Sequence, residues 1–290
     1  MRCPNCQNKG YLEYKIINSY RLLRCAHCDI LYTRIDRKTK LSEVNINKYN
    51  SNYYKNYLAR GEKYISRYIL NMNWLSKFKD LRNSKFLDIG CGAGTLLDII
   101  KKQYSDNVYG IDPNEYLVDH CRMRNLGIIK KAKMNSLPFD DNMFDCITCF
   151  DVLEHSAMLK KNLFEINIVL KFNGFLVIQC PNYKSLMQFA CGDLWDWWCP
   201  PDHIIHFSKS SLRRVLFDRG FDLIFIKTYD DLIDYIKNIK GALRKRGFNK
   251  ISTIMLLLLF IIIRPHLNYL GYGGLTYIIL KKNNICACRF

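Results

Sequence analysis

Apolar and polar positions along residues 85–229 follow two alternating patterns. Short, continuous apolar runs that fit buried strands are separated by longer segments with apolar residues at helical spacing. The strand-like runs are KFLDIG, NVYGID, GIIKKA, MFDCITCF, GFLVIQCPN and FDLIFIKTY, with helices expected from about Ala93, Asn114 and Ser208 and another ending near Leu170. This alternation predicts an α/β fold with a Rossmann-like, mostly parallel sheet and helices on both faces. With GGLTYIILKK as the last strand, the sheet has seven strands.

The segments on either side of this core have different patterns. Residues 1–40 hold short β-like runs at 11–17 and 30–32 around a polar turn, which predicts a small ribbon. Residues 41–84 show apolar positions at helical spacing and form an expected helical connector, whose aromatic residues are assigned to packing. The core then covers residues 85–230, and residues 231–290 form a basic and hydrophobic helical insertion followed by the last strand.

Four cysteines near the N-terminus indicate a metal site. Cys3 and Cys6 form one CxxC pair, Cys25 and Cys28 form a second, and 18 residues separate the pairs. That spacing is typical of a zinc ribbon, in which four thiolates close a tetrahedral structural site. A redox role for one pair is the alternative. We expect a small N-terminal zinc ribbon with about one structural zinc ion per chain.

The charge of the chain is unevenly distributed. The formal net charge is +18. Residues 1–84 carry +11 (17 basic and 6 acidic side chains), residues 85–230 carry −1 (17 and 18), and residues 231–290 carry +8 (10 and 2). Basic flanks could bind RNA, anionic lipid or sugar phosphate, or they could be solvated lysine-rich surfaces. Charge alone therefore does not choose a partner.

A strand followed by three alternate glycines is the most informative segment of the core. Phe86 to Ile89 lead into Gly90, Gly92 and Gly94, where a helix begins. Glycines allow the backbone to turn sharply and to approach a ligand closely. This GxGxG spacing is tighter than the dinucleotide fingerprint, and Asp88 would repel a pyrophosphate but suits a cationic amino group. Asp112 ends the next strand, where a carboxylate can accept both hydroxyls of a ribose.

With these residues, the core resembles the class I S-adenosylmethionine-dependent methyltransferases, in the branch near the ubiquinone-biosynthesis O-methyltransferases. The matching segments are FLDIGCGAG, GID, LPFDDNMFD, DVLEH, VLKFNGFLVIQCPN and HFSKSSLRRVLFDRGF. The ribbon is similar to the N-terminal parts of some sugar methyltransferases and to the zinc ribbons of certain ribosomal RNA guanine methyltransferases. The resemblance implies S-adenosylmethionine as cofactor, and it is specific for the superfamily rather than for the acceptor.

The resemblance also implies roles for individual residues. Asp88 and the glycines hold the methionine side of the cofactor, Asp112 holds the ribose, and Asn135 lies near the adenine. Phe150 and Asp151 face the sulfonium. The full expected cofactor set is Asp88, Gly90, Cys91, Gly92, Gly94, Asp112, Pro113, Asn135, Phe150 and Asp151.

Two histidines are the candidate catalytic residues. Methyl transfer to a hydroxyl needs one base, and imidazole titrates near neutral pH. His155 in the DVLEH segment is the first candidate and His206 is the second, with His203 beside it. The alternative is that His155 only packs or caps. Relatives in this branch also use a divalent metal near this segment, which implies that Glu154, His155 and His206 could share one.

Two further segments suggest how substrates and surfaces are recognised. The tryptophan-rich segment 194–203 follows the fifth strand of the core and is interpreted as a wall for an acceptor, with internal packing as the alternative. The segment ISTIMLLLLFIII follows a basic stretch, and at thirteen residues it is too short to span a membrane. We expect 241–265 either to contact a membrane surface or to cover the sheet.

The sequence thus predicts an enzyme, EC 2.1.1, that methylates a small or carrier-linked acceptor. The acceptor is expected to be a hydroxyl, with a glycan or a lipid-linked sugar favoured. FDVLEH stands where an NPPY motif for amine methylation would be, which counts against N-methylation of nucleic-acid bases. The alternatives are a zinc-ribbon RNA methyltransferase and a non-catalytic scaffold that only binds the cofactor. The N-terminus lacks an apolar run, so we expect a cytoplasmic protein, associated with the inner face of the membrane if 241–265 binds lipid.

Overall fold

A seven-stranded sheet forms the centre of the protein in the computed structural model, which describes residues 2–35 and 64–283. The strand order is β10-β11-β8-β7-β4-β5-β6. Strands β8, β7, β4, β5 and β6 are parallel, whereas β11 is antiparallel to both of its neighbours, β8 and β10. The strands are β4 (Phe86–Ile89), β5 (Val108–Asp112), β6 (Ile128–Lys131), β7 (Phe144–Phe150), β8 (Leu170–Pro181), β10 (Phe221–Tyr229) and β11 (Leu275–Lys282).

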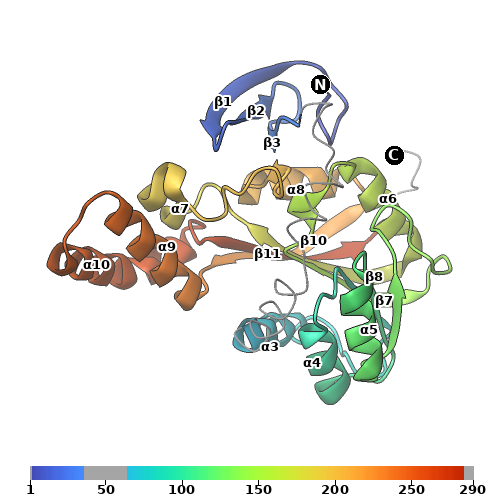
Figure 1. The fold of residues 1–290 in the computed structure, drawn as a ribbon. Coiled ribbons are helices and arrows are strands. Elements are labelled where there is room, and N and C mark those ends of the chain that lie inside the picture. The colour runs from blue at the N-terminus through green and yellow to red at the C-terminus, as the bar shows by residue number, and fades with distance from the viewer. Residues whose placement is uncertain (1, 36–63, 284–290) are drawn as a thin grey trace.

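Helices cover both faces of the sheet (Figure 1). One face is covered by α3 (Ile65–Leu75), α4 (Thr95–Gln103) and α5 (Glu115–Met123), and the other by α6 (Leu159–Val169) and α8 (Lys209–Phe217). The predicted Rossmann-like α/β fold is confirmed. The residues of FLDI and ITCF are all buried and, apart from Asp88 and Thr148, apolar, because helices exclude water from both sides of the sheet.

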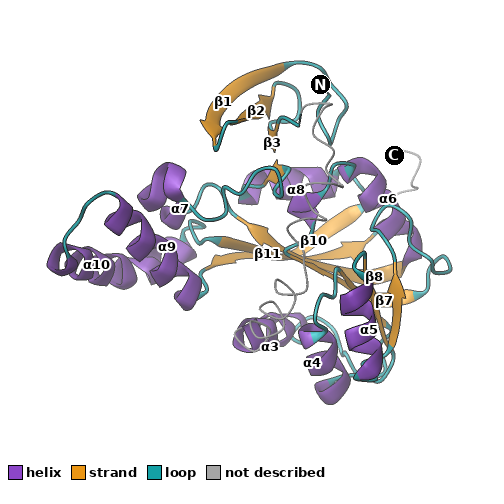
Figure 2. Ribbon diagram, viewed as in Figure 1, coloured by secondary structure: helices purple, strands orange, loops and turns teal. Residues whose placement is uncertain are grey.

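The remaining helices extend beyond the carboxyl ends of the parallel strands. They are α7 (Leu186–Cys191), α9 (Leu232–Lys245) and α10 (Lys250–Tyr269). Figure 2 shows α9 and α10 together at one end of the molecule, beyond the sheet. The apolar run that we expected to contain thirteen residues lies within a helix of 20, because residues flanking the run are also helical.

The N-terminal ribbon forms a second sheet, in the order β1-β2-β3-β9. Its own strands are β1 (Tyr11–Ile17), β2 (Tyr20–Cys25) and β3 (Leu31–Thr33), and the fourth strand, β9 (Ile205–His206), comes from the part of the chain that forms the larger domain. Leu31 pairs with His206 and Tyr32 with Ile205. The ribbon is therefore joined to the larger domain by backbone hydrogen bonds, a contact that local sequence patterns do not reveal.

The expected helical connector is only partly within the described residues. Helix α3 lies in its second half, and the predictions for residues 41–63 concern residues outside the part that the structure describes. On α3, the buried side chains are Arg67, Asn71, Met72 and Leu75, so the inward face carries two polar residues. This unusual face lies next to the candidate site.

Candidate functional site

The glycine turn after β4 has the strained backbone that its sequence suggests. Gly90, Gly92 and Gly94 all have positive φ angles, of 71°, 52° and 77°. A Cβ atom on Gly90 would lie 2.4 Å from Val152 Cγ2, and one on Gly94 would lie 2.3 Å from Leu126 Cδ1. Glycine is therefore needed for conformation and for space. The turn leads directly into α4, whose N-cap is Gly94.

Asp88 lies under this turn and is only 4% exposed. Thr148 Oγ1 donates a hydrogen bond to Asp88 Oδ1 at 2.7 Å. Burial raises the pKa of Asp88 to about 7, although the Thr148 hydrogen bond acts in the opposite direction. A buried carboxyl group with such a pKa is suited to gain its charge when a cation binds beside it.

Asp112 connects the end of β5 to the glycine turn. Its Oδ2 accepts a hydrogen bond from Gly92 N at 3.1 Å, and its Oδ1 accepts one from Asn114 N at 2.8 Å. Burial raises the pKa of this carboxyl group as well. Each carboxylate oxygen can accept a second hydrogen bond, so the arrangement leaves acceptor capacity for ribose hydroxyls. The carboxylate thus orients the turn as well as offering a ligand contact.

The other expected cofactor residues differ in how far they are buried. Cys91 is buried inside the turn, and Pro113 is exposed just after β5. Asn135 is half-buried, and its amide lies 3.6 Å from Met158 Sδ. Phe150, at the end of β7, is 7% exposed. No contact of these residues identifies the ligand, so their roles stay predictions.

Arg67 is a residue of this site that the sequence reasoning missed. Its guanidinium group, 5% exposed, lies 2.7 Å from Asp151 Oδ2, and Gln179 Nε2 donates to Asp151 Oδ1 at 2.9 Å. Burial disfavours the cation, but the attraction of Asp151 together with that of three neighbouring tyrosines outweighs it and raises the pKa of Arg67. The ion pair therefore fixes Asp151, which itself has a positive φ of 57°.

A buried polar network extends this ion pair into the sheet. Asn71 Nδ2 donates to Gln179 Oε1 at 2.7 Å, and the Tyr229 hydroxyl lies within hydrogen-bond distance of both Asn71 Oδ1, at 3.0 Å, and Gln179 Oε1, either of which can accept its one proton. Tyr68 of α3 stacks on Phe150 with ring centroids 6.0 Å apart. The sequence feature that could have indicated this network is the spacing of Arg67 and Asn71. They lie four residues apart on the helix face that also carries Leu75.

His155 lies shortly after a valine that packs against the glycine turn. Val152, the neighbour that a Gly90 Cβ would strike, is three residues earlier, and His155 ends the short 3₁₀ helix η2 (Leu153–His155). The side chain is exposed, and its Nδ1 lies 2.8 Å from the backbone oxygen of Asp202. Because a carbonyl only accepts, Nδ1 carries the proton and the lone pair is on Nε2.

Glu154, His155 and His203 form a cluster with metal-ligating groups. Their ligand atoms all lie within 4.8 Å of one another. Glu154 is 2% exposed, its Oε2 is buried without a hydrogen-bond partner among the described residues, and burial raises its pKa well above the usual value. This donor set fits a divalent cation, with His203 in the position that the resemblance implied for His206.

His206 is located at the contact with the ribbon. It is 4% exposed, and its Nε2 lies 3.0 Å from Thr33 Oγ1 on β3. Burial lowers its pKa to about 3. The ring also packs edge-on against Trp198. These contacts give His206 a neutral, enclosed environment, which suits a positioning residue better than a base.

The tryptophan-rich segment is mostly packed inside. Trp195 and Trp198 are 2% and 3% exposed, and their rings meet edge to face at 5.1 Å. Both residues also border a cavity of about 390 Å³ whose lining includes Asp193, Asp196 and Asp202. The structure therefore shows the internal packing of these tryptophans, and the role of the segment as a wall for an acceptor stays a prediction.

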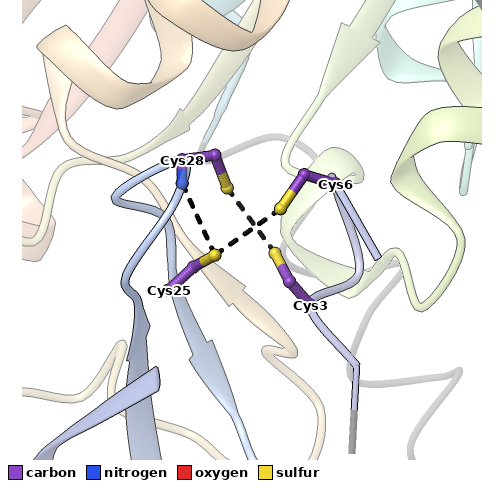
Figure 3. A group of neighbouring side chains, drawn as sticks. All are labelled: Cys3, Cys6, Cys25 and Cys28. Atoms are coloured by element: carbon purple, nitrogen blue, oxygen red, sulfur yellow. Dashed lines mark hydrogen bonds between the residues drawn. The ribbon is translucent and has the colours of Figure 1, made fainter. Parts of the chain in front are cut away.

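The four N-terminal cysteines converge as a zinc site would require (Figure 3). Cys3 and Cys28 have sulfur atoms 3.6 Å apart, and those of Cys6 and Cys25 are 3.5 Å apart. Thiolates around a zinc ion at 2.3 Å form a tetrahedron with edges of roughly 3.8 Å. The separations are far longer than a disulfide bond, so all four cysteines are available as ligands. The cluster fits a structural zinc ion.

Comparisons with known proteins agree with this fold and this turn. The family model described as "Methyltransferase domain" matches residues 57–225, more than half of the chain. A 24-methylenesterol C-methyltransferase of Arabidopsis thaliana is 37% identical over 30% of this chain and 26% of its own length. The ubiquinone biosynthesis O-methyltransferase of Hydrogenovibrio crunogenus is 29% identical over 30% of this chain and 38% of its own.

These matches cover parts of the proteins. An uncharacterized protein of Methanocaldococcus jannaschii is 34% identical over 39% of this chain and 48% of its own length, so the chain spans less than half of each of these three relatives. Among solved structures, a SAM-dependent methyltransferase from Archaeoglobus fulgidus has a TM-score of 0.50 at 20% identity, covering 74% of this chain and 94% of its own.

A chain from the complex of the Haloferax volcanii Trm112 methyltransferase activator has a TM-score of 0.60 at 15% identity, covering 80% of this chain and 97% of its own. At such identities the structural likeness shows the fold. The family model, however, covers the strand, the glycine turn and both acids, and the relatives include an enzyme of the expected branch. The chain therefore belongs to the S-adenosylmethionine-dependent methyltransferases that share this methyltransferase domain.

Proposed function

We propose that the protein transfers the methyl group of S-adenosylmethionine to a hydroxyl of a small or carrier-linked saccharide, with His155 as the base. The observation that carries this proposal is the position of His155. Its Nδ1 is held by the Asp202 carbonyl, and its exposed ring follows directly after the residues that pack on the glycine turn. A neutral imidazole with its lone pair on Nε2 can accept a proton.

The chemical step needs only positioning and removal of one proton. His155 Nε2 takes the proton of the acceptor hydroxyl while the hydroxyl oxygen forms a bond to the methyl carbon. The carbon–sulfur bond breaks with its electrons moving to sulfur, so the second product is S-adenosylhomocysteine. Proton transfer to a placed base contributes roughly 10²–10⁴-fold to rate. Asp88, Asp112 and Asp151 act before this step, by holding the methyl donor and the loop that carries His155.

A polyhydroxylated acceptor is supported by the cavity that Asp202 borders, since the Asp202 backbone oxygen lies 2.8 Å from His155 Nδ1. The charged residues that line the cavity are three acids, Asp193, Asp196 and Asp202, and one lysine, Lys245. Ionised carboxylates accept hydrogen bonds and match the many donors of a saccharide. The ubiquinone O-methyltransferase relative supports an oxygen acceptor, whereas the sterol C-methyltransferase relative makes a carbon acceptor the second outcome to test.

A divalent cation at Glu154, His155 and His203 would supply a Lewis acid that lowers the pKa of the acceptor hydroxyl. His155 would then be a ligand rather than a base. The two roles are separable by experiment, because a chelator abolishes the turnover of protein whose ribbon still holds its zinc, as checked by elemental analysis, only in the second case. Dialysis against EDTA, followed by addition of Mg²⁺, Mn²⁺ or Zn²⁺ and measurement of turnover, distinguishes them.

The direct test uses purified protein, a radiolabelled methyl donor and a fractionated lysate. We expect label in saccharide or lipid-linked saccharide fractions. His155→Gln should lower turnover by about 10²-fold or more, with unchanged binding of S-adenosylhomocysteine by calorimetry. His266→Gln, an exposed histidine on α10, is the matched control. Label only in RNA, or full turnover by the His155 variant, would overturn the corresponding part of the proposal.

A further inference from the structure

Helix α10 has one face packed on the protein and one face exposed. Leu256, Leu257 and Phe260 pack against the core cluster of α7 and α9. The Tyr235 hydroxyl of α9 donates a hydrogen bond to the Phe260 backbone oxygen at 3.0 Å. The outward residues are Ile251, Ile254, Met255, Leu258, Leu259, Ile262 and Tyr269, all of them exposed. From Ile251 to Ile262 they recur at three- and four-residue intervals, so these six form one continuous apolar stripe, and Tyr269 lies two turns further along the helix.

This exposure is large for a protein surface in water. Ile251 is 72% exposed, Met255 is 66% exposed and Ile262 is 68% exposed. At 20 residues the helix is about 30 Å long. By length and composition, α10 is the helix among the described residues that could cross a membrane. A stripe of this size calls for a partner surface that is itself apolar.

The topology of the sheet shows how such a helix can meet a membrane. In the chain, α10 lies between β10 and β11, and β11 pairs with β10 on one side and with β8 on the other. If α10 crossed a bilayer, β11 would be on the opposite side from the strands that flank it. The folded sheet therefore excludes a spanning helix and leaves an orientation parallel to the membrane surface.

Charges at both ends of the stripe match anionic headgroups. Six cationic side chains and no acidic one lie between Tyr235 and Lys250. Of these, Lys240, Arg244, Lys245 and Lys250 are exposed and form no ion pair among the described residues. At the other end, Leu270 borders a cavity of about 690 Å³ that is also lined by Lys184, Lys209, Arg213 and Arg214.

We propose that the outward stripe of α10 inserts into the headgroup region of an anionic lipid bilayer, with the helix parallel to the surface. The apolar side chains reach the acyl boundary, while the flanking lysines and arginines lie at the level of the lipid phosphates. This orientation agrees with the position of α9 and α10 at the end of the molecule, away from the ribbon (Figure 1). The proposal does not depend on the identity of the methyl acceptor.

Vesicle flotation of the full chain tests this proposal. Vesicles of phosphatidylcholine with about one third phosphatidylglycerol are compared with vesicles of phosphatidylcholine alone, at low and high salt. We expect binding to the anionic vesicles that weakens with salt and is released by alkaline carbonate. Leu258→Glu/Ile262→Glu should weaken binding by at least about tenfold, since it places charge where acyl chains would be.

A second variant tests the electrostatic part. Arg244→Glu/Lys245→Glu should weaken binding to anionic vesicles by about 25-fold or more, because each near-surface cation contributes about 1 kcal/mol, or roughly fivefold. Met123→Glu on α5, where the side chain is 77% exposed, is the control and should bind as the wild type does. Melting temperature and S-adenosylhomocysteine binding confirm that each variant is folded.

Three results would overturn the proposal. The first is a wild-type chain that does not float with anionic vesicles at low salt. The second is resistance to carbonate extraction, which would indicate a spanning helix. The third is a wild-type dimer in lipid-free solution that Leu258→Glu/Ile262→Glu converts to a monomer, since the stripe would then be an interface between two copies.

Discussion

Asp88 couples cofactor binding, pH and stability in a way that can be measured. Its carboxyl group is 4% exposed, and burial raises its pKa from 3.8 to about 7. In the unfolded chain the group ionises near pH 4. Folding therefore opposes its ionisation, so this contribution to stability is fully present below about pH 4 and is lost as the pH rises to about 7.

The magnitude follows from the size of the shift. A difference of about three pKa units corresponds to about 4 kcal/mol, at roughly 1.4 kcal/mol per unit. Asp88→Asn removes the charge and keeps an oxygen that can accept from Thr148. We expect the variant, without cofactor at about pH 8, to be more stable than the wild type by up to about 4 kcal/mol. At about pH 4 the difference should vanish.

Binding should show the opposite effect. If the cationic amino group of the ligand lies beside Asp88, the carboxylate form is favoured in the complex, and binding releases a proton when the pH is below 7. Affinity for S-adenosylhomocysteine should then fall by about 25-fold between about pH 7.5 and pH 5.5. The upper limit stays below about pH 7.7, where the ligand's own amino group begins to lose its proton.

Calorimetry and chemical denaturation provide both measurements on the same samples. Asp88→Asn should bind more weakly than the wild type at about pH 7.5 and should lose most of the pH dependence. A wild-type affinity that is constant over this range, together with an Asn variant no more stable at about pH 8, would refute the reasoning. A constant affinity alone would contradict the placement of the ligand's amino group beside Asp88. An Asn variant that is no more stable would alone contradict the raised pKa of Asp88.

Three further predictions concern the turn, the ion pair and the ribbon. Gly90→Ala should destabilise the protein by about 1–3 kcal/mol in urea unfolding, and Val152→Ala should restore part of that loss if the 2.4 Å contact is responsible. Arg67→Met leaves the Asp151 carboxylate without its cation, so it should lower the free energy of unfolding by about 3–5 kcal/mol or abolish cofactor binding. An unchanged stability together with an unchanged cofactor affinity by calorimetry would contradict the role given to this ion pair. Elemental analysis should find about one zinc per chain, and Cys28→Ser should lower both zinc content and melting temperature; a metal-free, fully folded wild type would disprove the site.

The parts of the fold that follow from short stretches of sequence could be predicted. The strand, turn and helix from Phe86 to α4 are contiguous, and their pattern contains both the apolar run and the glycines that the backbone requires. The parallel direction of the central strands likewise follows from the β-α alternation, since parallel neighbours need crossover helices, whereas the order of the strands in the sheet was not predicted. These features are local or are fixed by general rules of chain connection.

The partners of individual polar residues could not be predicted in the same way. Arg67 meets Asp151 across 84 residues of sequence, and Thr33 meets His206 across 173. Helical periodicity identified the inward face of α3, but it does not indicate which buried polar residue finds which partner. For the same reason His206 looked like a candidate base, although its surroundings come from a strand of the ribbon.

The pairing of β3 with β9 also affects how the protein is made. Thr33 and its acceptor, the His203 carbonyl, are separated by 170 residues. At synthesis rates of roughly 5–20 residues per second, β3 stays unpaired at the edge of the newly made ribbon for roughly 10–30 s, until β9 has been synthesised. An unpaired strand edge is a site for unwanted association. Early binding of zinc would order the nascent ribbon, but the edge of β3 can be paired only after the larger domain has been synthesised.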